Sequence, residues 1–183
     1  NLTMPIDLNR MHRQSAEVFH AEGRSVEMLR ADMKSLIGRA NDNDRKRARF
    51  CVNLTPAEPV HQMFIAHGKD IYIRPHKHLN KTESILVLDG EVDYVAFSDE
   101  GKIADVKTMG PYESGHPFFQ TIESDMYHTI IIRSPWLIFV EVTKGPFVKK
   151  DTQFANWSPL ESEPVKGLYF LENHLINWSQ PAG

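Results

Sequence analysis

Three histidines and one glutamate have the spacing of a metal site. His76 and His78 lie two residues apart, so on an extended strand both imidazoles leave the same face. Glu83 comes five residues after His78, and the polar segment 79–82 is expected to form a hairpin tip that brings Glu83 back opposite the histidines. His128, at the start of a later β-branched run, is the expected third nitrogen ligand. These protein ligands leave open positions on a divalent ion, which catalytic metal sites need.

The expected ligand set combines ring nitrogens with one carboxylate oxygen. Such a set suits Fe(II), Mn(II), Ni(II), Co(II) or Zn(II), and the affinity order alone does not choose among these ions. A bound ion would act as a Lewis acid or lower the pKa of a bound water to about 7. A His-x-His pair alone is usually a surface feature, and a histidine at a strand end is often a cap. The four residues together favour the metal site.

Three further residues are candidate catalytic groups. Tyr72 and Arg74 precede His76 at alternate positions, so an unbroken strand would point both side chains inward with the ligands. Arg74 would hold a carboxylate or phosphate of the substrate, and a surface ion pair is the alternative. Glu141 interrupts the apolar run 136–142, where burial would raise its pKa and suit it as a general base. An edge-strand charge is the alternative for this residue.

Other titratable side chains have weaker patterns. Further candidates for the pocket are Tyr94, His116 and Tyr127. The remaining histidines have no partners in pattern and are expected to be exposed or structural: His12, His20, His61, His67 and His174.

The metal-site residues resemble the motifs of the cupin superfamily. His76-x-His78-x4-Glu83-x6-Gly90 is similar to the first cupin motif, and residues 123–128 are similar to a degraded second motif. In the second motif Asp125 stands where glycine commonly makes the turn before the histidine, and aspartate tolerates a left-handed backbone better than most residues. Segments 72–78, 139–147 and 154–159 further resemble cupin-fold metalloproteins of the WbuC type. The resemblance covers roughly residues 45–159. It implies a double-stranded β-helix that binds a metal, and the family is associated with surface-polysaccharide gene clusters.

The residue pattern divides the chain into three parts. Residues 1–44 are expected to be a helical extension, with helices over 7–22 and, after Ser25, over 26–40. Residues 45–155 are expected to form the barrel, because a period of two and Pro- and Gly-rich connectors begin near Arg49. The expected strands are 48–53, 61–66, 70–74, 84–88, 92–98, 103–109, 118–122, 128–133 and 136–143. Residues 156–183 carry many large apolar side chains and are expected to pack on the barrel or on a second subunit, in a conformation that the pattern does not give.

The expected fold class is therefore mainly β: a cupin double-stranded β-helix, or jelly-roll barrel, with N-terminal helices and a C-terminal extension. With 183 residues and a net charge of -3, the chain can bury a sizeable core and gives no reason to expect nucleic acid.

The basic cluster 45–49 has Asp42 and Asp44 beside it and is expected to be a solvated helix end. Cys51 is the only cysteine, which favours a reducing compartment, and the apolar runs are too short to span a membrane. A cytoplasmic location is expected.

The ligand pattern and the resemblance are compatible with more than one function. The first is a metal-dependent enzyme acting on a small polar substrate such as a sugar, by isomerisation, epimerisation or oxygen-dependent chemistry. The alternative is a non-catalytic module in which the ion helps to capture a small ligand or stabilises the barrel. A weaker third possibility is a metal-free epimerase of the cupin type. By analogy with cupins of this size, a homodimer is expected.

Overall fold

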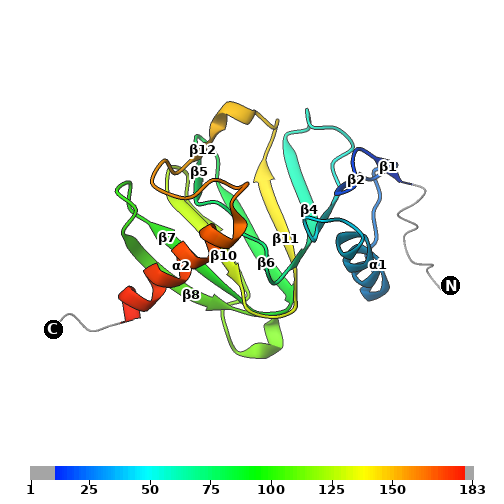
Figure 1. The fold of residues 1–183 in the computed structure, drawn as a ribbon. Helices are drawn as coiled ribbons and strands as arrows, with labels where there is room; N and C mark the ends of the chain where they lie inside the picture. Colours follow the sequence, from blue (N-terminus) through cyan, green and yellow to red (C-terminus); the bar gives the residue numbers. More distant parts are fainter. Residues whose placement is uncertain (1–10, 180–183) are drawn as a thin grey trace.

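The computed structural model describes residues 11–179, which form two facing β-sheets flanked by two helices (Figure 1). In sheet order, the first sheet contains β1 (His12–Arg13), β2 (Val18–His20), β3 (Arg47–Cys51), β4 (Val60–Gly68), β11 (Trp136–Lys144), β6 (Glu83–Asp89) and β9 (Phe119–Ile122). The second contains β12 (Thr152–Phe154), β5 (His76–His78), β10 (Tyr127–Ile132), β7 (Val92–Phe97) and β8 (Ile103–Met109). The helices are α1 (Arg30–Asn41) and α2 (Pro164–Ser179), and short 3-10 turns lie at Tyr112–Ser114 and Lys149–Asp151. The mainly β jelly roll predicted from the sequence is confirmed.

The main core lies between the two sheets, where alternate side chains of each strand point inward. Strand β4 contributes Met63 and Ile65, and β10 contributes Ile130 and Ile132, all buried in one cluster. Because His128 lies two residues before Ile130, the same alternation directs its ring inward at the start of β10.

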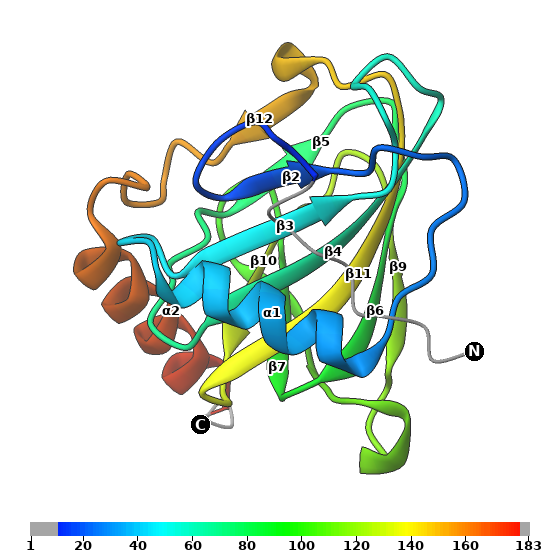
Figure 2. The ribbon, with the colours of Figure 1, turned by 90° about the vertical axis from the view of Figure 1, so that its right-hand side faces the viewer.

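Helix α1 covers the outer face of the seven-stranded sheet, as Figure 2 shows. The helix predicted over 26–40 therefore forms, but it begins at Arg30 instead of directly after Ser25. The Asp32 carboxylate accepts a hydrogen bond from the backbone N–H of Leu29 at 2.6 Å, which caps the first turn at this point.

The helix predicted over 7–22 is wrong for the part that the structure describes, because β1 and β2 occupy it. Ser15 Oγ accepts a hydrogen bond from the backbone N–H of Glu17 at 3.2 Å and so makes a turn between the two strands. Phe19 then lies beside β3 and is only 2% exposed. Burial of this strand against the sheet outweighs the helical spacing of the apolar residues. Residues 7–10 lie outside the described part of the chain.

Helix α2 covers the outer face of the five-stranded sheet (Figure 1). Leu171 packs against Tyr72, and Gly167 permits the close approach, since a Cβ at this position would lie 2.4 Å from the Tyr72 ring. Arg133, which follows β10, also forms an ion pair with Glu172 of the helix. The C-terminal segment is thus a helix docked on the barrel. Within residues 11–179, neither helix is long and apolar enough to cross a membrane.

Candidate metal centre

The four predicted ligands meet in the space between the two sheets. His76 and His78 come from β5, and His128 comes from β10 as the register partner of His76. One ring nitrogen from each histidine lies within 4.8 Å of those from the other two. Glu83 begins β6 on the facing sheet, and its Oε2 lies 3.3 Å from His78 Nε2 and 3.5 Å from His128 Nε2. The structure therefore brings all four side chains together.

Glu83 reaches the histidines by a different route from the one predicted. Residues 79–82 are not the tip of a hairpin, because β5 and β6 belong to different sheets. Asn80 has a φ of 60°, in the left-handed region, and the chain passes there from one sheet to the other. Glu83 consequently approaches the histidines from the facing sheet and not from an adjacent strand.

The turn before His128 keeps its left-handed residue despite the altered motif. Asp125 has a φ of 66°, a conformation that glycine adopts more readily than other residues. Its backbone N–H donates a hydrogen bond to the carbonyl oxygen of His78 at 2.9 Å. The turn is therefore tied directly to the strand that carries the first two histidines.

Each imidazole at the site is held through its Nδ1 atom. In His76 and His128, Nδ1 lies 2.9 Å and 3.0 Å from the carbonyl oxygen two residues earlier in the chain. A carbonyl oxygen can only accept, so both Nδ1 atoms carry a proton, and Nε2 is the atom through which each ring would offer a lone pair to a metal ion. His78 Nδ1 lies 3.2 Å from the hydroxyl oxygen of Thr152 in β12. Such partners typically orient the histidine ligands of metal ions.

The pKa shifts of His76 and Glu83 fit a bound cation. Burial, reinforced by the charge of His128, lowers the pKa of His76 to about 3. Burial opposes ionisation of Glu83, but hydrogen bonds from His128 and His78 outweigh it and hold the pKa of this carboxyl well below its usual value. Ring nitrogens and a carboxylate therefore face one another, and a proton or a metal ion between them relieves the repulsion. Three nitrogen donors and one oxygen donor suit a divalent transition metal.

Glu141 of β11 lines the same cavity beside Glu83. In the sheet register Thr143 lies opposite Glu83, and Glu141 lies opposite Ile85, so the two carboxyl groups are diagonal neighbours on the inner face. Burial, the charge of Glu83 and a hydrogen bond to Glu83 together raise the pKa of Glu141 well above its usual value. The pair therefore consists of a carboxylate at Glu83 and a carboxylic acid at Glu141.

Glu141→Gln is expected to remove part of the pH dependence of stability in the metal-free protein. A carboxyl whose pKa is raised on folding stabilises the folded state below its unfolded pKa of about 4.3. This contribution is lost as the pH rises from the unfolded pKa through the higher pKa of Glu141 in the folded state. Over that pH interval the free energy of unfolding of the wild type should decrease relative to that of Glu141→Gln, as measured in urea titrations with a chelator present. Parallel pH curves for the two proteins would contradict the raised pKa.

Tyr72 lies outside the cavity, so the expectation that it points inward with the ligands is wrong. The predicted strand over 70–74 does not form, and β5 begins at His76. Tyr72 is 3% exposed beneath α2, and its hydroxyl donates a hydrogen bond to the carbonyl oxygen of Pro159 at 2.9 Å. Without regular strand alternation before His76, the ring turns to the outer side of the sheet.

Arg74 lines the cavity, but its guanidinium is bonded to the chain that follows β12. Its Nη2 donates to the carbonyl oxygen of Ala155 at 2.7 Å, and its Nε donates to Ser158 Oγ at 3.2 Å. Its guanidinium carbon also lies 5.4 Å from the centre of the Phe154 ring. These contacts hold the segment after β12 against the site and use two of the five N–H donors of Arg74.

The weaker candidates have varied surroundings. Tyr94 is buried, with its ring stacked 6.1 Å from that of His128. His116 is exposed and does not line the cavity. Tyr127 packs against Trp157, with ring centres 5.7 Å apart, in the cluster beneath α2. Of these three, only Tyr94 contacts a predicted ligand.

The cavity has a volume of about 470 Å³ and extends beyond the metal ligands. His67 of β4 and Arg49 of β3 line it, and no site role was predicted for either. His67 was expected to be exposed or structural, and it lies on the cavity wall. The period-two alternation of β4, which places Met63 and Ile65 inward, is the signal that could have placed His67 there.

Comparisons with known proteins gave one family model and several solved structures. Residues 28–109 match a family model described as Domain of unknown function (DUF6016), and no curated protein matches the chain. A structure of CapF with the inhibitor 3-isopropenyl-tropolone has 16% identity and a TM-score of 0.50 over 62% of this chain and 32% of that chain. A mutant of Bacillus subtilis oxalate decarboxylase has 16% identity and a TM-score of 0.46 over 59% of this chain and 27% of that chain. KdgF from Halomonas sp. has 12% identity and a TM-score of 0.45 over 60% of this chain and 87% of that chain.

The two facing sheets and the likeness to CapF show that the chain has the cupin fold. The chain spans less than a third of the length of the CapF and oxalate decarboxylase chains that it matches. Within this fold, His76, His78 and His128 form a group that could hold a metal ion. The chain is thus similar to cupin-fold proteins, and its particular substrate and reaction are matters for a proposal.

Proposed function

We propose that this protein is a metal-dependent enzyme that acts on a small polar substrate, such as a sugar or sugar derivative. The observation that carries the proposal is the convergence of three oriented imidazoles on the Glu83 carboxylate. Structural metal sites are usually closed by their ligands, whereas this one adjoins a cavity of about 470 Å³. A cavity of this size holds a small molecule next to the ligands.

In this proposal His76, His78, His128 and Glu83 would hold a divalent ion of Fe, Mn, Ni, Co or Zn. Such an ion supplies Lewis acidity towards a carbonyl or hydroxyl oxygen of the substrate. Glu141 carries a proton beside Glu83 and can give it to a substrate atom or, once ionised, take one back. A group that both gives and takes a proton suits isomerisation or epimerisation.

The sugar derivative is suggested by sequence resemblance. The segments that resemble WbuC-type cupins surround the ligands, and that family is associated with surface-polysaccharide gene clusters. The resembling segment 154–159 also contains the residues that bond Arg74, so part of the resemblance coincides with contacts that support the site.

A non-catalytic, metal-dependent ligand-binding module is the second candidate. It is favoured by the placement of Tyr72 under α2 and by the bonding of Arg74 to Ala155 and Ser158, which give two of the three predicted catalytic groups structural contacts. A substrate screen separates the two functions. A binding module would show a ligand-induced rise in Tm without product, whereas the enzyme would release product.

Elemental analysis of protein purified without chelator or nickel resin tests the metal site directly. We expect one transition-metal ion per chain, and a peak between the four ligands in an anomalous-scattering map of crystals. Protein that is folded at neutral pH but contains no metal, and binds none of the five ions on titration, would contradict the proposed function.

A further inference from the structure

We propose that Arg49 and His67 form a subsite for a carboxylate group of the substrate, on the seven-stranded sheet that also carries Glu83. The inference rests on the proposed function, because it assigns the chemical class of the molecule that the cavity accepts. The substrate class would be a small acid with hydroxyl groups, such as a sugar acid.

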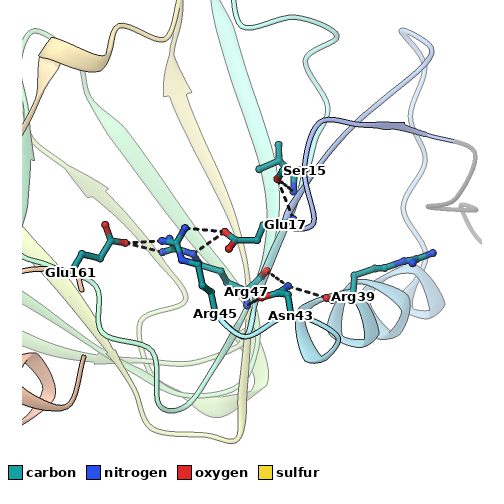
Figure 3. Close-up of polar contacts among 8 residues, drawn as sticks. Ser15, Glu17, Arg39, Asn43, Arg45, Arg47 and Glu161 are labelled. Carbon is teal, nitrogen blue, oxygen red and sulfur yellow. Dashed lines mark hydrogen bonds and ion pairs between the residues drawn. The ribbon is translucent and has the colours of Figure 1, made fainter. Parts of the chain in front are cut away.

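Arg49 is one of three arginines at alternate positions, and the other two are neutralised within the protein. Figure 3 shows Arg45 and Arg47 between two glutamates from distant parts of the chain. Arg47 lies 3.1 Å from a carboxylate oxygen of Glu17 and 3.1 Å from one of Glu161. Arg45 lies 3.4 Å and 3.0 Å from the same two groups. Arg45 and Arg47 therefore form ion pairs within the protein, and Arg49 differs from them.

Arg49 has no ion pair with any acid among residues 11–179. The one hydrogen-bonding contact of its side chain in this part of the chain is from Nη1 to the sulfur of Met63, at 4.0 Å. Its side chain lines the cavity and is exposed there. A guanidinium in this position keeps its planar fork of donors available for a bidentate contact with a carboxylate.

His67 supplies a second polar group next to Arg49. Arg49 lies opposite Ile65 in the register of β3 and β4, so His67 is its diagonal neighbour on the same face. Neither ring nitrogen of His67 has a hydrogen-bond partner in the described part of the chain, and its Nδ1 is buried. Burial and the charge of Arg49 lower the pKa of His67 to about 3, so the ring is neutral and can donate one hydrogen bond. A buried polar atom without a partner is unfavourable, and a ligand oxygen would satisfy it.

Charge and distance favour a carboxylate as the occupant. One unpaired guanidinium balances one negative charge, and a doubly charged phosphate would lie along a face that already carries the Glu83 carboxylate. In the sheet order β3-β4-β11-β6, Arg49 is three strands from Glu83, about 14 Å at the backbone. Both side chains enter the cavity from these strands and shorten that gap. A molecule of several carbon atoms can therefore reach from Arg49 to the metal ligands.

The test compares D-glucuronate with D-glucose by calorimetric titration of the metal-loaded full chain. We expect glucuronate to bind about tenfold to a hundredfold more tightly than glucose. Arg49→Gln should abolish this preference, and His67→Ala should reduce it. Arg30→Gln makes the same chemical change on the exposed start of α1 and should keep the preference. Lys81→Gln, which changes another cation that lines the cavity, should keep it as well.

Several outcomes would overturn the subsite. They are equal affinity for the two sugars, the absence of binding by either, a preference that survives Arg49→Gln, and tighter binding of glucose 6-phosphate than of glucuronate. Unchanged metal content and Tm in Arg49→Gln would show that its effect is local. If the wild type holds its metal but shows no preference for the acid, this inference fails and the proposed function stands. If the wild type holds no metal, the proposed function fails whatever the sugar titrations show.

Discussion

Replacing His128 by alanine is expected to weaken metal binding by more than about a hundredfold. The substitution removes one of three oriented ring nitrogens and also one of the two histidines that hydrogen-bond to Glu83. Because loss of an outer-shell partner already costs about tenfold to a hundredfold in metal affinity, loss of a ligand should cost more. Titration of metal-free protein with Zn(II) or Mn(II) against a competing chelator measures the effect.

Two matched variants test the role of His128. His116→Ala removes an exposed histidine outside the cavity and should leave metal affinity unchanged. Thr152→Val removes the hydroxyl that contacts His78 Nδ1 and should weaken binding by about tenfold. Wild-type affinity in His128→Ala, measured on a variant with an unchanged circular dichroism spectrum, would show that His128 is not a ligand.

Gly90→Ala is expected to lower the free energy of unfolding by about 2 to 5 kcal/mol. Gly90 has a φ of 92°, a conformation that side chains with a Cβ rarely adopt. A Cβ there would lie 2.3 Å from the carbonyl oxygen of Trp136 and 2.5 Å from Ser134 Oγ. The carbonyl belongs to the backbone of β11, so it cannot move without disturbing the sheet. Urea denaturation of the metal-free protein measures the change.

Gly38→Ala is the matched control for this prediction. Gly38 lies inside α1, and a Cβ at this position would meet no atom within 4 Å. Because alanine favours the helix, the control should be more stable than the wild type by about 0.5 to 1 kcal/mol. A Gly90→Ala protein as stable as the wild type would mean that the turn after β6 can rearrange freely.

The convergence of the candidate ligands could be predicted from the sequence because its signal is local. The His-x-His spacing places two rings on one face of a strand, and the run after His128 continues the same alternation into the core. The route of Glu83 could not be predicted in this way. A polar segment of four residues can close a hairpin or pass between sheets, and pairing with strands far along the chain decides between them.

The residues whose positions were predicted wrongly pack against segments that lie far along the chain. Tyr72 has the correct spacing for an inward side chain, but its ring packs against α2, which lies almost a hundred residues later. The apolar spacing over 7–22 is compatible with a helix, yet the pairing of Phe19 alongside β3 buries it in a strand. The sequence did not indicate that Arg49 and His67 lie close together, because only the register of β3 and β4 makes them neighbours.

Strand β5 is only three residues long, and it lies between β10 on one side and β12 on the other. Since β12 leads into the segment that ends in α2, the proposed ion binding and docking of the C-terminal segment would be thermodynamically linked. Either event preorganises the short strand and so lowers the free energy needed for the other. A segment that supplies no ligand would in this way help to set how tightly the protein holds its ion.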